Sequence, residues 1–274
     1  MDQLLYPPTD LLQRVGNVDA AQQEKIYDDI GRVARQQIES ALPSAWSWNG
    51  KRVLDFGCGA GRVLRQFADC ADMADLHGCD IHEPSIAWMN DNLGEYLSGI
   101  TCQEQPGLPF DNDTFSLIYA ISVFTHLTEF STAWLVELRR ILAPDGYLMV
   151  TVLDGGLIRL LAGEDWDENR IGFNALLPGN PWDVGGPIVF MSRWWIEAHW
   201  GRAFNIIEIR PGVEGGQGFV VMQKTPLTIS AEEIDRVSDD PREITALQHN
   251  VRQLSRETSQ LRRALAALTS NPAS

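Results

Sequence analysis

The sequence predicts an α/β protein in which helices cover both faces of a mostly parallel sheet of about seven strands. Short apolar runs alternate with longer stretches of helical periodicity from about residue 50 onward, which is typical of parallel strands joined by helices. The first apolar run leads directly into three alternating glycines, Gly57, Gly59 and Gly61. The last two runs are joined by the short glycine-rich link 211–217, which can connect only antiparallel neighbours.

We expect five parallel strands in the first part of the sheet and an antiparallel pair at its end. The strands are expected at residues 52–56, 76–80, 100–103, 115–121 and 146–152, and then at 204–210 and 218–224. Helices are expected at 62–69, 84–97 and 130–142. Pro84 suits a first helical turn, and the Pro and Gly within residues 143–146 break the chain before the next strand.

Four further regions surround or interrupt this sheet domain, which we place at residues 50–228. An N-terminal cap at 1–49 contains a probable amphipathic helix at 22–42, which is either a lid over the binding site or a passive packing helix. An insertion at 154–193 is rich in Gly, Pro and Trp, and loops of this length in a compact domain are usually functional. A linker at 229–241 precedes a C-terminal helix at 242–270.

The composition indicates a globular protein that stays in the cytoplasm. Hydrophobic residues make up 44% of the 274 residues, enough for a substantial core. No stretch approaches the roughly 20 apolar residues of a membrane span, and the N-terminus has no export signal. The net charge of −15 would repel phosphate backbones, so nucleic acids are not expected partners.

The cysteines predict buried, reduced thiols. The four are Cys58, Cys70, Cys79 and Cys102, and they have neither the spacing of a zinc site nor that of a disulfide framework. We therefore expect no metal site built on cysteine.

The glycine turn at residues 57–61 is the most informative motif. Its glycines can adopt positive φ and let a ligand approach the backbone closely. A turn that binds dinucleotides would read G-x-G-x-x-G, but here the third glycine comes one residue early and Arg62 takes its place. Asp55, which closes the first strand, would repel a pyrophosphate and attract an ammonium. The motif therefore favours a nucleoside cofactor that carries an amino-acid group.

A second carboxylate, Asp80, ends the second strand, next to the glycine turn in a sheet of this kind. It can accept charge-assisted hydrogen bonds from both hydroxyls of a ribose, with Ile81 packed on the adenine. The alternative is that Asp80 is the N-cap of the helix that opens at Pro84.

The D-x-G-x-G-x-G pattern of residues 55–61 resembles motif I of the class I S-adenosylmethionine-dependent methyltransferases. The resemblance extends over about residues 50–224 and implies a Rossmann-like methyltransferase fold with S-adenosylmethionine as cofactor. It also implies a set of cofactor-binding residues: Asp55, Gly57, Cys58, Gly59, Gly61, Asp80, Ile81, Gln105, Leu108, Ile121 and Ser122. The sequence departs from the family around "LPF" at 108–110, where no Asp stands at the usual adenine contact, leaving Gln103, Glu104 or Gln105 as substitutes.

His126 is the candidate catalytic residue. It lies in the segment SVFTHL at 122–127, which is similar to the active-site segment of many family members. An imidazole can accept a hydroxyl proton near neutral pH, so His126 suits a general base. The alternatives are that it orders the loop or touches the cofactor. His199, on an expected helix, is interpreted as structural.

The acceptor is interpreted as a sugar hydroxyl in a glycan or glycoconjugate, because the sequence resembles bacterial methyltransferases associated with glycan assembly. The aromatic and acidic residues of the insertion suit a polyhydroxylated acceptor, with Trp166 and Trp182 as open candidates for stacking. Trp194, Trp195 and Trp200 are interpreted as core residues. The alternative acceptor is a small molecule or natural product. The alternative classes of protein are a nucleotide-dependent oxidoreductase and a non-catalytic cofactor-binding scaffold.

The C-terminal helix carries a heptad pattern that predicts a homodimer. Its apolar positions recur at spacings of three and four, with Ile244 and Val251 at a and leucines at d, which favours a parallel two-stranded coiled coil that Thr258 at a should weaken. The positions are Ile244, Leu247, Val251, Leu254, Thr258, Leu261, Leu265 and Leu268. Packing of this helix back on its own domain is the alternative.

Overall fold

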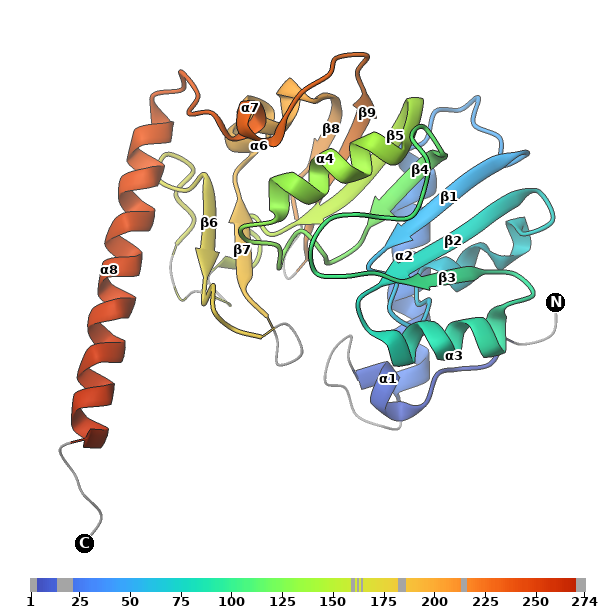
Figure 1. Ribbon diagram of the computed structural model, residues 1–274, viewed down its shortest axis with the longest axis horizontal. Helices are drawn as coiled ribbons and strands as arrows, with labels where there is room; N and C mark the ends of the chain where they lie inside the picture. The colour runs from blue at the N-terminus through green and yellow to red at the C-terminus, as the bar shows by residue number, and fades with distance from the viewer. Residues whose placement is uncertain are drawn as a thin grey trace, which may run out of the picture.

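The computed structural model describes residues 4–13, 22–158, 161, 163, 165–181, 186–212 and 216–269. A seven-stranded sheet with the order β3-β2-β1-β4-β5-β9-β8 forms its centre (Figure 1). The strands are β1 (Lys51–Phe56), β2 (Ala74–Asp80), β3 (Ser98–Thr101), β4 (Phe115–Ala120), β5 (Leu142–Val152), β8 (Phe204–Arg210) and β9 (Gly218–Lys224). In the spatial order β3-β2-β1-β4-β5, each strand pairs in parallel with the next. Strand β9 pairs antiparallel with both β5 and β8. The predicted fold class is therefore confirmed, including the antiparallel last strand.

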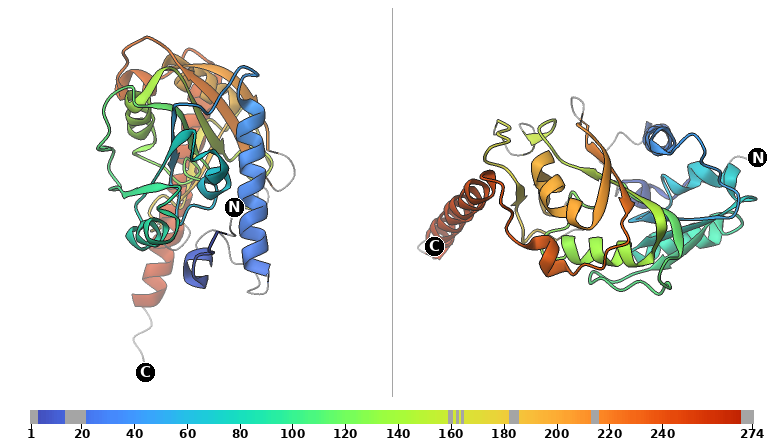
Figure 2. Two further views of the ribbon diagram at one scale, coloured as in Figure 1. Left: turned by 90° about the vertical axis from the view of Figure 1, so that its right-hand side faces the viewer. Right: turned by 90° about the horizontal axis from the view of Figure 1, so that it is seen from above.

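Helices cover both faces of the sheet, and each face has its own apolar core. On one face α2 (Gln23–Ala41), the 3-10 helix η2 (Leu64–Cys70) and α3 (Glu83–Leu93) pack over β1 and β2. On the other face lie α4 (Ser131–Ile141), α6 (Arg193–His199) and the short η4 (Trp200–Arg202). Figure 2 shows α2 and α4 on opposite sides of the strands. The short α1 (Thr9–Gln13) contacts α2.

The segment after the glycine turn is a 3-10 helix, where the sequence predicted an ordinary helix at 62–69. In an α-helix the carbonyl of Gln66 would accept a bond from the amide four residues later. Here that carbonyl accepts a hydrogen bond from Arg35 of α2, whose guanidinium also pairs with Asp69 at 2.7 Å. The 3-10 helix η2 thus leaves the carbonyl of Gln66 to Arg35 of α2.

The insertion forms a two-stranded antiparallel ribbon that the sequence did not predict. Its strands are β6 (Phe173–Leu176) and β7 (Ile188–Met191), and the isolated bridge between Leu153 and Phe190 connects it to the end of β5. Each strand has only four residues, which is too short for a period-2 pattern to stand out between Gly and Pro.

The segment expected to be a linker contains the short helix α7 (Ala231–Asp235), which begins with a capping box between Ser230 and Glu233. Ile234 of this helix is fully buried in the same core as α4. The chain then enters α8 (Arg242–Thr269), which projects away from the body in Figures 1 and 2. Among the described helices, none is long and apolar enough to cross a membrane.

Candidate active site

The glycine turn and the end of β2 are tied together by Asp80. One carboxylate oxygen of Asp80 accepts a hydrogen bond from the amide of Gly59 and the other from the amide of His82, both at 2.8 Å. The N-cap of α3 is His82, so Asp80 is not the cap of that helix. Each carboxylate oxygen keeps a further lone pair for a ligand. The arrangement places a charged acceptor directly beside the turn.

The three glycines of the turn all have positive φ, but they serve different purposes. A Cβ on Gly57 would lie 2.3 Å from Cγ2 of Val123, and one on Gly61 would lie 2.9 Å from Sδ of Met89. A Cβ on Gly59 would meet no atom within 4 Å. Gly57 and Gly61 therefore allow close packing within the protein, whereas Gly59 faces open space where a ligand can approach.

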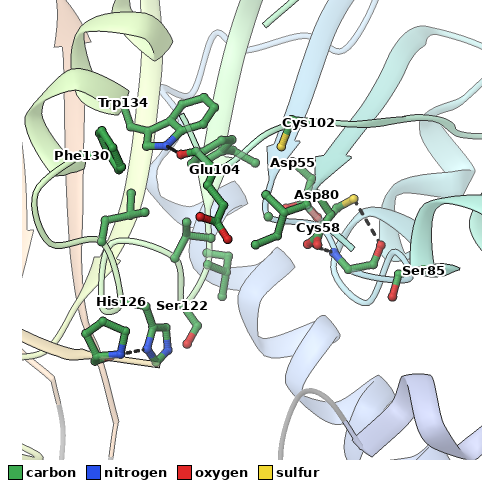
Figure 3. Close-up of a pocket in the computed structure, with 18 of the residues that line it drawn as sticks. Asp55, Cys58, Asp80, Ser85, Cys102, Glu104, Ser122, His126, Phe130 and Trp134 are labelled. Atoms are coloured by element: carbon green, nitrogen blue, oxygen red, sulfur yellow. Dashed lines mark hydrogen bonds between the residues drawn. The ribbon is translucent and has the colours of Figure 1, made fainter. Parts of the chain in front are cut away.

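That open space belongs to a cavity of about 1,100 Å³ at the carboxyl ends of β1, β2 and β4. In Figure 3, Asp55, Cys58 and Asp80 lie together on one side and His126 with Ser122 on another. Nine of the expected site residues line the cavity: Asp55, Gly57, Cys58, Gly59, Asp80, Ile81, Ile121, Ser122 and His126. The sequence motifs thus converge on one site.

Three expected site residues do not line this cavity. Gly61 packs beneath α3, and Leu108 is buried in the core, where its amide donates a 2.6 Å hydrogen bond to Glu137. Gln105 lies exposed on the loop after β3. On this side of the cavity the wall is formed instead by Gln103 and Glu104, the other substitutes considered for the adenine contact. We expected Gly61, Gln105 and Leu108 to contact the cofactor directly. Their positions outside the cavity lining correct this expectation.

Asp55 is a buried carboxyl group that lacks a full set of partners. Burial raises the pKa of Asp55 to about 8; the nearby Arg62 opposes this rise and Asp80 adds to it. In the described part of the chain, Oδ2 of Asp55 and Nε of Arg62 have no hydrogen-bond partner. A buried carboxyl oxygen without a donor is costly, so an added ammonium group would stabilise this position. This observation fits the amino-acid portion of the expected cofactor.

Ser122 holds a strained backbone at the end of β4. Its φ of 62° is in the left-handed region, which is unusual for a residue other than glycine. The surrounding structure fixes this conformation, because the amide of Ser122 donates to Oγ1 of Thr151 at 2.6 Å and its hydroxyl accepts from Gln217 at 2.9 Å. Strain of this kind concentrates at functional sites, and Ser122 lines the cavity.

His126 has a defined tautomer when neutral. Its Nδ1 lies 2.7 Å from the carbonyl oxygen of Pro187, and because a carbonyl only accepts, Nδ1 must carry the proton (Figure 3). The lone pair of the neutral ring is then on Nε2. The neighbouring amide of Val189 donates to the carbonyl of Thr125 at 2.8 Å, which holds β7 against the same loop. The ring is thus oriented by the β6–β7 ribbon.

The remaining walls of the cavity come from the N-terminal region, which the sequence offered as a lid, and from the ribbon, which it did not predict. Leu11 and Tyr27 contribute from the N-terminal region, and the hydroxyl of Tyr27 donates to the carbonyl of Ala60 at 3.2 Å. Arg62 could have been found, because it replaces a glycine of the dinucleotide pattern. The ribbon side is formed by residues that carried no sequence signal: Pro178, Asn180, Pro181 and Pro187.

The aromatic residues of the insertion do not line the cavity where the structure describes them. Trp194, Trp195 and Trp200 are buried core residues, as expected. Trp166 packs against Gly155, and its indole nitrogen lies 3.4 Å from Glu168. Trp182 lies outside the described residues.

His199 and the cysteines occupy buried positions. His199 stacks on Trp195 and contacts the Ile234 carbonyl and Glu243, so its environment is that of a structural residue. The cysteines are all free and buried, and Cys58 and Cys102 also touch the cavity. In the part of the chain that the structure describes, no cluster of potential metal ligands is present.

Comparisons with known proteins identify a domain family within this chain. Residues 53–146 match the family described as methyltransferase domain. No match is found among curated protein sequences.

Solved structures with a similar fold share little sequence with this chain. Magnesium protoporphyrin IX methyltransferase from Synechocystis PCC 6803, solved with bound SAH, is 17% identical over 79% of this chain and 94% of its own, with a TM-score of 0.52. An S-adenosylmethionine-dependent methyltransferase from Mesorhizobium loti is 13% identical over 69% of this chain and 96% of its own, with a TM-score of 0.50. A protein from Pyrococcus horikoshii is 18% identical over 70% and 91%, with a TM-score of 0.51.

Residues 53–146 therefore form a methyltransferase domain, and the protein is a methyltransferase enzyme. S-adenosylmethionine is its cofactor. The residues at the site fit this cofactor, since Oδ2 of Asp55 lacks a donor and the backbone at Gly59 leaves open space.

Proposed function

We propose that this methyltransferase transfers a methyl group to a sugar hydroxyl in a glycan or glycoconjugate. The observation that carries the proposal is the orientation of His126, which lines the cavity with Nδ1 engaged by Pro187 and Nε2 left as the basic nitrogen. A hydroxyl oxygen is a poor nucleophile until its proton is removed, so an oriented base is what an oxygen acceptor requires.

Each side of the cavity has a distinct part in this reaction. Asp55 would hold the ammonium of the cofactor, Asp80 its ribose, and Ile81 would pack on its adenine. Bound S-adenosylmethionine supplies an activated methyl group on a positively charged sulfur. His126 would accept the hydroxyl proton at Nε2, and the carbonyl of Pro187 would stabilise the resulting imidazolium through Nδ1. Positioning of the two substrates then contributes most of the rate enhancement.

The charges around the cavity favour an uncharged acceptor. Four carboxyl groups line it, from Asp55, Asp80, Glu104 and Glu129. Among the described lining residues Arg62 is the single lysine or arginine, and it lies beside Asp55. An acceptor with phosphate or carboxylate groups would meet repulsion from these carboxyl groups, and among the described lining residues only Arg62 could offset it. A neutral sugar avoids this cost.

The ribbon side of the cavity provides contacts suited to a sugar. Proline rings offer flat apolar surfaces to the C–H faces of a pyranose, while Thr128, Glu129 and Asn180 offer hydrogen-bonding groups to its hydroxyls. These contacts support the proposal that the insertion at 154–193 lies on the acceptor side. Leu11 and Tyr27 likewise support a cap at 1–49 that helps to enclose the substrates.

A small-molecule or natural-product acceptor is the second candidate. It is favoured by the form of the cavity, which draws its walls from the N-terminal region, the sheet and the ribbon, and which could enclose a compact hydroxylated compound. The fold itself does not separate the two candidates, because it hosts many acceptors.

The test is a methylation screen with isotopically labelled S-adenosylmethionine and the full-length protein. We expect mass spectrometry to detect label on a hydroxyl of neutral mono- or oligosaccharides, and weaker labelling of matched sugars carrying a phosphate at the accepting end. Labelling of non-sugar phenols or alcohols alone would establish the second candidate. Cofactor binding without turnover on either panel would favour a non-catalytic scaffold.

A further inference from the structure

We propose that α8 is a dimerisation helix through which a second copy of this chain binds as a parallel two-stranded coiled coil. The contact surface is the α8 seam, which we define by the positions Ile244, Leu247, Val251, Leu254, Thr258, Leu261 and Leu265. This inference concerns assembly and is independent of the proposed acceptor.

The α8 seam is exposed in the structure of the single chain. Exposed fractions of its large apolar side chains run from 43% for Leu247 to 71% for Leu261, and Val251 and Leu265 exceed 60%. Isolated exposed leucines are common, but a continuous row along one helix is not. The helix therefore presents an apolar surface that its own domain leaves uncovered.

The domain instead holds α8 by a different, mostly polar stripe. Asn174 of β6 donates to Asn250 at 2.8 Å and to Gln253 at 2.7 Å. The side chains of Asn250 and Gln253 donate in turn to the carbonyls of Phe173 and Ala175, at 2.7 and 3.3 Å. These amide contacts fix both the position and the rotation of the helix on β6.

The same stripe continues to the first turn of the helix. There the carboxylate of Glu243 pairs with His199 at 2.9 Å, and Ala246 is buried in the core. At 100° per residue, the docked stripe lies about a quarter of a turn from the α8 seam. The helix therefore does pack on its own domain, as the alternative considered from the sequence has it, but through the docked stripe, and the seam stays exposed.

The composition of the seam fits a second copy of the same helix. Ile244 and Val251 at a positions, with leucine at d positions, favour two parallel strands, whereas Thr258 at an a position weakens the pair. Glu257 at a g position would face Arg262 at the e position of the partner helix, and the reverse contact would form by symmetry. A parallel pair is therefore matched in shape and in charge.

A membrane surface fits the seam less well. Helices that lie in a membrane interface have a broad apolar face with aromatic residues and a basic border. The seam is a narrow row of aliphatic side chains, and its borders include the uncharged Gln248, Asn250 and Ser255.

The placement of α8 leaves room for a partner. From Ile244 to Leu265 the seam spans about 32 Å at 1.5 Å per residue. Figures 1 and 2 show the C-terminal half of α8 extending beyond the body, so a second helix can lie along it.

The first experiment measures the mass of the full-length protein by light scattering at micromolar concentration. We expect twice the chain mass of 30.6 kDa. The double substitution Leu254→Glu with Leu261→Glu should give a monomer, because it places charges in the seam. These side chains are exposed in the single chain, so the domain should still fold and bind cofactor with unchanged affinity.

Ser259→Glu is the matched control, since it adds a charge on the same helix at an exposed position about 110° from the seam. This variant should remain dimeric. A monomeric full-length protein would overturn the proposal, and a dimer that survives the double substitution would place the interface on the body.

The second experiment tests the parallel orientation. Thr258 occupies an a position, where the same residue of each chain meets in a parallel, in-register pair. Thr258→Cys should therefore form an intermolecular disulfide under mild oxidation, and Ser259→Cys should not. Dimers in which Thr258→Cys fails to crosslink would exclude the parallel arrangement.

Discussion

The two sides of the cavity are built in different ways. On the cofactor side, contacts join the glycine turn to the end of the adjacent strand, as when the amide of Gly59 donates to Asp80. On the proposed acceptor side, walls come from segments far apart in the chain, such as His126, Asn180 and Pro187. The first side is thus fixed by one motif and its neighbour, whereas the second depends on how the ribbon packs against the end of β4. Changes on the two sides should therefore affect different steps.

His126 provides the largest expected effect. His126→Ala should lower turnover about 10²- to 10⁴-fold, because the acceptor proton would lose its oriented base. Cofactor affinity should change only a few-fold, since His126 lies across the cavity from Asp80 (Figure 3). Steady-state kinetics on the acceptor identified by labelling, together with calorimetric cofactor titration, measure the two quantities. Near-normal turnover would return His126 to a role in ordering the loop.

On the cofactor side, Asp80→Ala should weaken S-adenosylmethionine binding by roughly 2 to 4 kcal/mol, or about 30- to 1,000-fold, through loss of two charge-assisted hydrogen bonds. Asp75→Ala is the matched control, because Asp75 is an exposed carboxylate on the same strand, with Nε of Arg52 at 3.7 Å. Calorimetric titration of both variants checks this. Equal affinities would remove Asp80 from the cofactor site.

The cofactor side was the part that could be predicted from the sequence. The strands at 204–210 and 218–224 were placed at their observed bounds, and Asp55, Gly59 and Asp80 were correctly brought to one place. Both successes depend on local patterns, because strands end where apolar runs end and a glycine turn requires positive φ. The same reasoning failed at Leu108, which belongs to the core that supports the site.

The contacts on the proposed acceptor side could not be predicted, because they are long-range. No spacing in the sequence connects His126 with the carbonyl of Pro187, yet that hydrogen bond determines which ring nitrogen is basic. The four-residue strands of the ribbon owe their existence to pairing with each other and to the bridge at Leu153. The heptad seam was evident from the sequence, but the amide stripe that docks α8 on β6 was not, because amides at helix positions usually face solvent.

The third prediction concerns the pH dependence of cofactor binding. Since burial raises the pKa of Asp55 to about 8, this carboxyl group carries a proton near neutral pH in the ligand-free protein. Binding of an ammonium favours the carboxylate, so cofactor binding should release this proton. Affinity should therefore increase as the pH rises from about 6 to 7.5, by up to about tenfold per unit. The upper limit is set by the cofactor's own amino group, which loses its charge near pH 7.7 to 8.0.

Calorimetric titrations in two buffers of different ionisation enthalpy measure the released proton. Asp55→Asn should abolish both the proton release and the pH dependence, and a slope that persists in this variant would assign it to another group. The folding equilibrium provides a second measurement. Because the folded pKa lies above the unfolded value of about 3.9, the ligand-free protein should lose stability as the pH rises from about 4 to 8.

The smallest expected effect lies at the contact between α8 and the ribbon. Asn250→Ala removes the acceptor of one Asn174 bond and the donor to the carbonyl of Phe173. Asn174 is buried but keeps its hydrogen bond to Gln253. The free energy of local opening should therefore fall by about 1 kcal/mol, which is roughly a fivefold increase in the population of the open state. Hydrogen exchange measured by mass spectrometry should show this increase in peptides that cover β6 and β7, with no change at the glycine turn. Gln260→Ala, at an exposed position of the same helix, should leave both regions unchanged. An equal increase in hydrogen exchange at the ribbon and at the glycine turn would mean that the two sides of the cavity open together. The distinction between a locally built cofactor side and an acceptor side assembled from distant segments would then be lost.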